Sequence, residues 1–202
     1  MNPREALKYI AHALAWLLVT PSVVSFAVRC IILGRDRALQ GSTQAWALVP
    51  GVGGQYLRRA FLSRALTRCD RTATIEFGTL FSSASATIGR RAYIGPRCHI
   101  GWAHIEDDVL IAAAVHVPSG PDTHGTRDLG VPIRDQIGAL RAVRIGAGTW
   151  IGSNAVVLAD VGRDTIVGAG AVVTRPLPDR VIAAGVPARV LRQREPGPRA
   201  GR

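Results

Sequence analysis

The chain has 202 residues and a formal net charge of +11, and all but one of its 25 basic residues are arginine. This length allows one sizeable core with a small accessory segment. The three cysteines, Cys30, Cys69 and Cys98, are few and widely spaced, which excludes a disulfide framework. The arginine bias indicates phosphate- or carboxylate-bearing partners, or GC-rich codon usage, and the scattered basic residues without interleaved aromatics predict no nucleic-acid partner.

Residues 1–38 are predicted to form a hydrophobic, membrane-associating helical segment. The stretch from Ile10 to Val28 contains no Asp, Glu, Lys or Arg and is close to the ~20 residues that span a bilayer as a helix. Pro21 lies in its middle, and basic residues flank both ends. These features favour a helix–break–helix hairpin that dips into one leaflet. A single span and a helical pair packed on the protein are the alternatives.

Residues 39–71 are predicted to be a linker with an amphipathic helix. Pro50-Gly51 and Gly53-Gly54 indicate a turn, and Gln55 to Leu66 carries apolar residues at helical spacing with arginines between them. Such a helix could lie on anionic headgroups or cover the open end of the following domain. We favour the cap, because a solenoid needs its terminal core covered.

Residues 72–192 show aliphatic residues at every sixth position, as in Ile88, Ile94 and Ile100, usually followed by glycine. A period of six excludes an amphipathic helix and is too regular for a hairpin meander. It predicts a mainly β fold, a triangular solenoid whose inward aliphatic residues stack from coil to coil. Glycine is expected at the corners, where a small or positive-φ residue is needed. The last residues, 193–202, are expected to form a flexible basic tail.

These repeats, with the strings VPSGPDTHG (117–125), VPIRDQ (131–136), VGAGAVVTRPLP (167–178) and AAGVPARVLR (183–192), resemble the hexapeptide-repeat acyltransferases. The resemblance implies a left-handed parallel β-helix, a homotrimer and acetyl-CoA or another acyl-CoA as co-substrate. In that family, the pantetheine arm runs along the coils between two subunits. It also implies a saccharide or glycolipid acceptor.

A loop over residues 118–142 interrupts the repeats and is predicted to be extruded as the active-site loop. His124 lies in this loop and matches the catalytic histidine of the family. An imidazole with an ordinary pKa near 6.5 suits the removal of a proton from an attacking hydroxyl. Asp122 and Asp128 are candidates to orient its ring.

The cofactor-binding residues implied by the same motifs are Ser153, Ala169, Thr174, Arg175, Arg189 and Arg192. The small side chains would let the pantetheine arm approach the corners closely, and the arginines would face its phosphates.

Three further residues are candidates for the acceptor cleft. His99 and His116 are 17 residues apart across one shortened repeat, so they are expected to stack on the outside of adjacent coils. Arg134 lies in the loop. His99 and His104 have one spacing used by zinc sites in related β-helices, but no histidine lies upstream, so we expect no metal site.

The sequence therefore predicts an acetyl-CoA-dependent O-acetyltransferase that acts on a saccharide or lipid-linked glycan at the cytoplasmic face of the inner membrane. The early-coil asparagine of the sugar acetyltransferases is missing, which separates the acceptor from the galactoside and maltose types. An N-acyltransferase or serine-type enzyme with a soluble acceptor, and a non-enzymatic membrane adaptor, are the alternatives.

Overall fold

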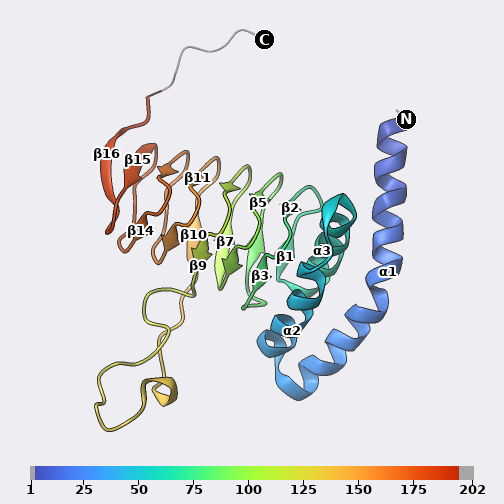
Figure 1. Ribbon diagram of the computed structural model, residues 1–202, viewed down its shortest axis with the longest axis horizontal. Helices are drawn as coiled ribbons and strands as arrows, with labels where there is room; N and C mark the ends of the chain where they lie inside the picture. The colour runs from blue at the N-terminus through green and yellow to red at the C-terminus, as the bar shows by residue number, and fades with distance from the viewer. Residues whose placement is uncertain (1–2, 196–202) are drawn as a thin grey trace.

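A computed structural model describes residues 3–195 and consists of three helices followed by a stack of triangular coils (Figure 1). The helices are α1 (Pro3–Leu33), α2 (Arg35–Ala47) and α3 (Gly51–Ala65). The coils form a left-handed parallel β-helix of about six turns, which confirms the fold class expected from the repeats. Part of the predicted tail, residues 196–202, lies outside the described residues.

The short strands of successive coils build three sheets, which we call faces A, B and C, and the strands pair in parallel except for the last strand of face B. Face A holds β1 (Arg68–Cys69), β4 (Thr87–Ile88), β7 (Ala103–Ile105) and β10 (Val143–Ile145). Face B holds β2 (Thr74–Ile75), β5 (Tyr93–Ile94), β8 (Leu110–Ile111), β11 (Trp150–Ile151), β13 (Ile166–Val167), β15 (Val181–Ala184) and β16 (Arg189–Gln193). Face C holds β3 (Leu80–Phe81), β6 (His99–Ile100), β9 (His116–Val117), β12 (Val156–Val157) and β14 (Val172–Val173).

The core is a column of inward residues, one from each strand, that stack on their register partners. On face B, for example, Ile75 pairs with Ile94, Ile94 with Ile111, and Ile111 with Ile151, all fully buried. Each coil thus buries its aliphatic side chains only against its neighbours, as in other solenoids.

The glycine that follows an inward residue is required for space. A Cβ on Gly89 would lie 2.5 Å from the carbonyl carbon of Glu106, and one on Gly152 would lie 2.5 Å from the amide nitrogen of Ala169. The positive φ that we expected at this position occurs two residues later instead, for example at Arg91 (54°) and Asn154 (59°). The repeat position is therefore glycine because the backbone of the next coil leaves no room for a Cβ. The residue with positive φ, two positions later, turns the corner.

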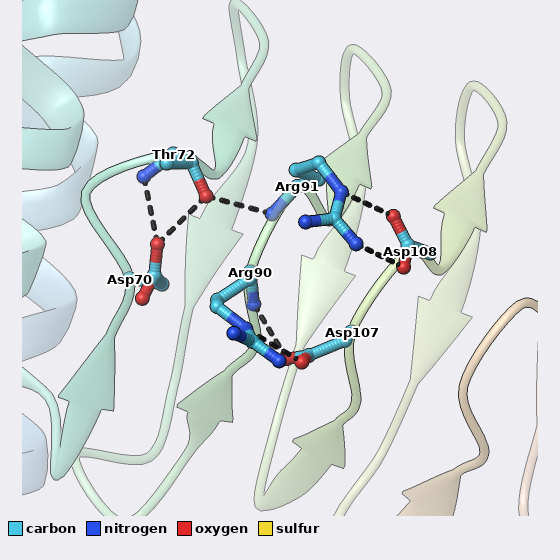
Figure 2. Close-up of polar contacts among 6 residues, drawn as sticks. All are labelled: Asp70, Thr72, Arg90, Arg91, Asp107 and Asp108. Atoms are coloured by element: carbon cyan, nitrogen blue, oxygen red, sulfur yellow. Dashed lines mark hydrogen bonds and ion pairs between the residues drawn. The ribbon is translucent and has the colours of Figure 1, made fainter.

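Side chains also tie the corners of adjacent coils together (Figure 2). Arg90 donates from its backbone N–H and Nε to Asp107 at 2.7 and 2.8 Å. Arg91 reaches both carboxylate oxygens of Asp108, with Nε at 2.6 Å. These exposed pairs align the coils and contribute little stability individually.

The first coil begins at Arg68, four residues before the predicted boundary, and α2 and α3 cover its open end. Arg58 is fully buried and donates from Nε to the carbonyl of Ile75 at 2.9 Å and from Nη1 to that of Val49 at 2.6 Å. Helix α3 thus lies against the end of the first coil, and Arg58 and Arg59 point inward, where they donate to edge carbonyls, and not outward as expected from an amphipathic helix.

Two predicted features of the helical region are wrong. The expected break at Pro21 is absent: α1 continues to Leu33, and the chain reverses at Gly34, whose φ is 80°. A proline removes one helical hydrogen bond, which the turns on both sides of it tolerate in this long helix. The turn expected at Gly53-Gly54 lies inside α3; Gly54 is glycine because a Cβ would lie 2.0 Å from the carbonyl oxygen of Val49.

Candidate active site

Face C and its two edges gather most of the predicted site residues. His99 on β6 and His116 on β9 are register partners, with ring centroids 5.8 Å apart in an edge-to-face arrangement. The stacking predicted from their spacing is thus confirmed. Burial lowers the pKa of His99 below its usual value, and the neighbouring His116 lowers it further. His99 therefore favours its uncharged form on the outside of the prism.

The predicted loop leaves face C directly after β9 and projects away from the coils (Figure 1). Its stem is an antiparallel ribbon, in which Arg141 donates to the carbonyl of Ser119 at 3.0 Å and Ala139 to that of Asp122 at 2.7 Å. The Ser119 hydroxyl accepts from the backbone N–H of Trp102 at 2.9 Å and fixes the root of the loop to the preceding coil. The loop is therefore held by hydrogen bonds, and we call residues 118–142 the arm. It returns the chain to face A at β10.

Gln136 holds the far part of this arm. Its amide nitrogen donates to the carbonyls of Asp128 at 2.6 Å and Val131 at 2.8 Å, and its carbonyl accepts from the N–H of Asp128 at 3.2 Å. The carboxylate of Asp128 is occupied by the N–H of Gly130 at 2.9 Å. Sequence reasoning assigned no role to Gln136 or Ser119, although Gln136 ends the VPIRDQ string.

His124 lies in the stem, where it forms a single bridge with Ile137, and it lines an open concavity of about 700 Å³. Asp122, Arg127 and Asp128 line the same concavity. Within the described residues, neither Asp122 nor Asp128 forms a hydrogen bond with the ring, so neither carboxylate orients the imidazole in this structure. Arg134 sits in the short helix η1 (Ile133–Asp135), pairs with Asp135 at 3.5 Å and does not line this concavity.

The predicted cofactor residues divide between the two edges of face C. Ser153 and Ala169 follow β11 and β13 and stack at the edge shared with face B, where Gly170 donates to the carbonyl of Ser153 at 2.8 Å. Thr174 and Arg175 follow β14 at the opposite edge, the one from which the loop leaves two coils earlier.

Arg189 and Arg192 lie on β16, which pairs antiparallel with β15 and extends face B. The sequence predicts them within the parallel repeats, and the antiparallel pairing of β16 corrects this. The segment before β16 runs beside face C, where Ala188 donates to the carbonyl of Val172 at 2.8 Å. Both arginines are exposed, beside the end of the stack.

The three faces differ in what they present to the outside. Face A carries polar residues, with Thr87 and His104 in contact at 2.9 Å and Arg144 bound to Glu106 at 2.7 Å. Face B carries an apolar ladder of register partners, namely Tyr93, Leu110, Trp150, Ile166 and Ile182. The loop adds exposed apolar side chains, of which Leu129 is 100% and Ile137 96% exposed. No group of three His, Cys, Asp or Glu side chains suited to a metal ion occurs among the described residues.

Comparisons with known proteins agree with this geometry. The family described as bacterial transferase hexapeptide (six repeats) matches residues 142–175. The chain is 38% identical over 175 residues to the serine acetyltransferase of Mycobacterium tuberculosis, covering 81% of this chain and 70% of that protein. It is 33% identical over 142 residues to the galactoside O-acetyltransferase of Escherichia coli, covering 57% and 67%. The chain spans only 28% to 45% of the length of three further curated acetyltransferases that it matches.

Solved structures share the fold. A maltose O-acetyltransferase from Clostridium difficile superposes with a TM-score of 0.69 and 20% identity, over 82% of this chain and 89% of that chain. A galactoside acetyltransferase in complex with coenzyme A gives a TM-score of 0.64 and 23% identity, over 79% and 81%.

Proposed function

Because the chain belongs to the hexapeptide-repeat acyltransferase family, we propose that it transfers an acetyl group from acetyl-CoA to a hydroxyl group of a saccharide or lipid-linked glycan, with His124 as the general base. The observation that carries this proposal is the position of His124 on an arm that leaves the prism at one edge of face C. The small residues Ser153 and Ala169 lie at the other edge of the same face.

The proposed chemistry is a direct transfer. A nitrogen of the His124 ring takes the proton of the acceptor hydroxyl while its oxygen attacks the thioester carbonyl carbon. The tetrahedral intermediate then collapses, the carbon–sulfur bond breaks, and the imidazolium returns the proton to the departing coenzyme A thiolate. No covalent acyl-enzyme is needed. Cys69 and Cys98 are buried and so are poorly placed to act as nucleophiles, and burial raises the pKa of the Cys69 thiol to about 12.

The acetyl-CoA is proposed to lie along the edge of face C, with its pantetheine arm beside Ser153 and Ala169. The galactoside acetyltransferase with the same fold was solved with coenzyme A. A neighbouring subunit of a homotrimer would cover the acetyl-CoA at this edge. The apolar ladder on face B and the exposed apolar residues of the arm support such a contact between subunits.

A soluble acceptor of the serine type is the second candidate. Its support is the serine acetyltransferase of Mycobacterium tuberculosis, which aligns with 81% of this chain. The two candidates differ only in the acceptor, since the thioester chemistry is the same.

The test is thiol release from acetyl-CoA in the presence of sugars, nucleotide sugars, lipid-linked glycans or L-serine. We expect release with a hydroxyl acceptor, and a loss of about 10²- to 10⁴-fold in turnover for His124→Ala. Asp135→Ala, a change of an exposed residue in the same arm that does not line the concavity of His124, is the matched control and should retain activity. Equal turnover of His124→Ala and wild type would refute the assigned base, and no thiol release with any acceptor would favour a non-enzymatic adaptor.

A further inference from the structure

A second pocket, of about 490 Å³, lies between α1, α3 and the first coil, at the end of the molecule that α2 and α3 cover. Its walls combine aromatic and cationic side chains, chiefly Tyr9, His12, Trp16, Arg59, Ser63 and Arg71. None of these residues belongs to the proposed acetyl-transfer site.

Arg59 is the buried cation of this pocket. The residue is only 9% exposed, its Nη1 donates to the carbonyl of Ala73 at 2.9 Å, and its Nη2 lies 3.3 Å from Nε2 of His12. Its Nε is buried without a hydrogen-bond partner, and among the described residues no carboxylate forms an ion pair with it. A buried charge with an orphaned donor is costly unless an anion compensates it.

The surroundings reinforce a preference for an anion. Arg71 stands exposed at the rim, and the first 72 residues contain ten basic and three acidic side chains, which is seven of the eleven net positive charges of the chain. Burial first, and then Arg59 and Arg71, lower the pKa of His12, so its uncharged ring can accept from Arg59. Each terminal nitrogen of Arg59 carries two N–H groups, so the contacts with Ala73 and His12 leave one N–H on each for an incoming phosphate.

The neighbouring face of α1 is apolar and uncovered. A narrow stripe that includes Ala15, Val19 and Phe26 packs against the cap, and the opposite side exposes large apolar residues, namely Ile10, Leu14, Leu17, Leu18, Val24, Val28, Ile31 and Ile32. The stretch Tyr9–Leu33 is long and apolar enough to cross a membrane by length and composition. Because the stripe holds α1 along α2 and α3, the helix meets a bilayer lengthwise, on its surface.

Aromatic residues mark the boundary between the two features. Tyr9 and Trp16 line the pocket and are partly exposed, and the guanidinium of Arg64 stacks 3.6 Å above the Trp16 ring. Tyrosine and tryptophan concentrate where headgroups meet acyl chains, and arginine binds the phosphates there.

We propose that this pocket binds the phosphate of an anionic membrane phospholipid, while the exposed apolar side of α1 lies in the adjoining acyl-chain layer. The site is separate from the acetyl-transfer reaction and positions the enzyme at a membrane surface.

The test is flotation of the whole 202-residue chain with vesicles of phosphatidylcholine alone or of phosphatidylcholine mixed with phosphatidylglycerol. We expect flotation with the anionic vesicles and little with the neutral ones. Arg71→Gln should weaken binding about tenfold, because it removes a charged phosphate contact. Arg37→Gln removes another exposed charge, from α2 outside the pocket, and should stay within about twofold. Leu17→Gln should abolish flotation, whereas Leu191→Gln, an equally exposed leucine on β16, should not.

Several results would overturn the proposal. Equal losses of vesicle binding for Arg71→Gln and Arg37→Gln would indicate attraction by the overall positive charge and not by the pocket. Equal flotation with neutral and anionic vesicles would exclude recognition of a phosphate-bearing anionic lipid. Binding of soluble glycerol 3-phosphate without vesicle binding would assign a soluble ligand. A fall in oligomer mass caused by Leu17→Gln in the absence of vesicles would assign α1 to a second copy of the chain. His124→Ala should float like wild type, so failure here and failure of the proposed function are distinguishable.

Discussion

The stacked pair of His99 and His116 shows how the pitch of the coil sets the chemistry of single residues. Each precedes an inward residue on face C, so each points outward, and the parallel register brings the two rings together. His99 is held with a lowered pKa by its burial and by His116. Protonation of His99 therefore opposes the folded state.

This arrangement predicts a loss of stability in mild acid. The unfolded chain binds a proton at the ordinary histidine pKa near 6.5, whereas folded His99 does not, so stability falls as the pH drops through that value. We expect His99→Gln to reduce the decrease in melting temperature between about pH 7.5 and pH 5. Val156→Gln, on the next strand of face C, is the control and should leave that decrease unchanged. An equal or larger decrease in His99→Gln would contradict the prediction.

Residue identity predicted some of the site and missed the rest for clear reasons. The role of His124 stays a prediction that rests on its string, whereas the stacking of His99 on His116 followed from counting along a fixed period. The clamp by Gln136 and the anchor by Ser119 could not, because they depend on how an irregular loop folds back on itself. Nearness in sequence suggests Arg134 for the same site, but η1 holds it in another part of the arm, outside the concavity of His124.

At the scale of the elements, the coil keeps two of its corners constant and varies the third. The inward residues of faces A and B, and those of faces B and C, are always six positions apart, as in Cys69, Ile75 and Phe81. From face C to face A the spacing is irregular: Phe81 to Ile88, Ile100 to Ile105, and Val117 to Ile145 across the arm. The arm is therefore inserted at the one corner whose length the fold does not restrict.

A glycine at a constant corner and a glycine within a helix should respond in opposite ways to substitution by alanine. Gly152→Ala forces a Cβ to within 2.5 Å of the next coil's backbone and should destabilise the protein by about 1–3 kcal/mol. Gly53→Ala places a Cβ in open space within α3 and should stabilise it by about 0.5–1 kcal/mol. Urea unfolding of both variants measures the difference, and two changes of the same sign would count against the spatial role of the repeat glycine.

The helices were less predictable than the coils, because tertiary contacts override their local pattern. In the sequence, Arg58 and Arg59 indicate a polar face turned to solvent. In the structure, both point inward, because they donate hydrogen bonds to backbone carbonyls at the open edge of the first coil. Pro21 reads as a break, yet it lies on the uncovered side of α1, where only one helical bond is lost.

At the scale of the whole molecule, the unequal faces of the prism indicate how copies of the chain would meet. Face A is polar, whereas face B exposes the ladder centred on Trp150, which is 48% exposed. We expect Trp150→Glu to convert a trimer into single chains of unchanged fold, as measured by light scattering and circular dichroism. Thr87→Glu, on face A, should leave the trimer intact. Retention of the trimer by Trp150→Glu would assign the contact to another face.

The same geometry predicts that each active site is shared between two chains. In one chain, the arm with His124 leaves face C at the edge with face A, while Ser153 and Ala169 lie at the edge with face B, on the other side of the same face. The arm also projects away from its own coils (Figure 1). A thioester held at the Ala169 corner of one prism would then meet the His124 of its neighbour, once the apolar ladders bring two prisms together.

Mixed trimers separate this arrangement from a site within one chain. His124→Ala lacks the base, and Ala169→Trp fills the space of the pantetheine arm, so each variant alone should be inactive. Random co-assembly in equal amounts places an intact arm beside an intact corner in about a quarter of shared sites, and thiol release should recover to that level. If His124 acted on acetyl-CoA bound to its own chain, every site would keep one lesion and activity would stay at background. Adding Trp150→Glu to both variants should abolish the recovery, because the recovery requires contact between chains.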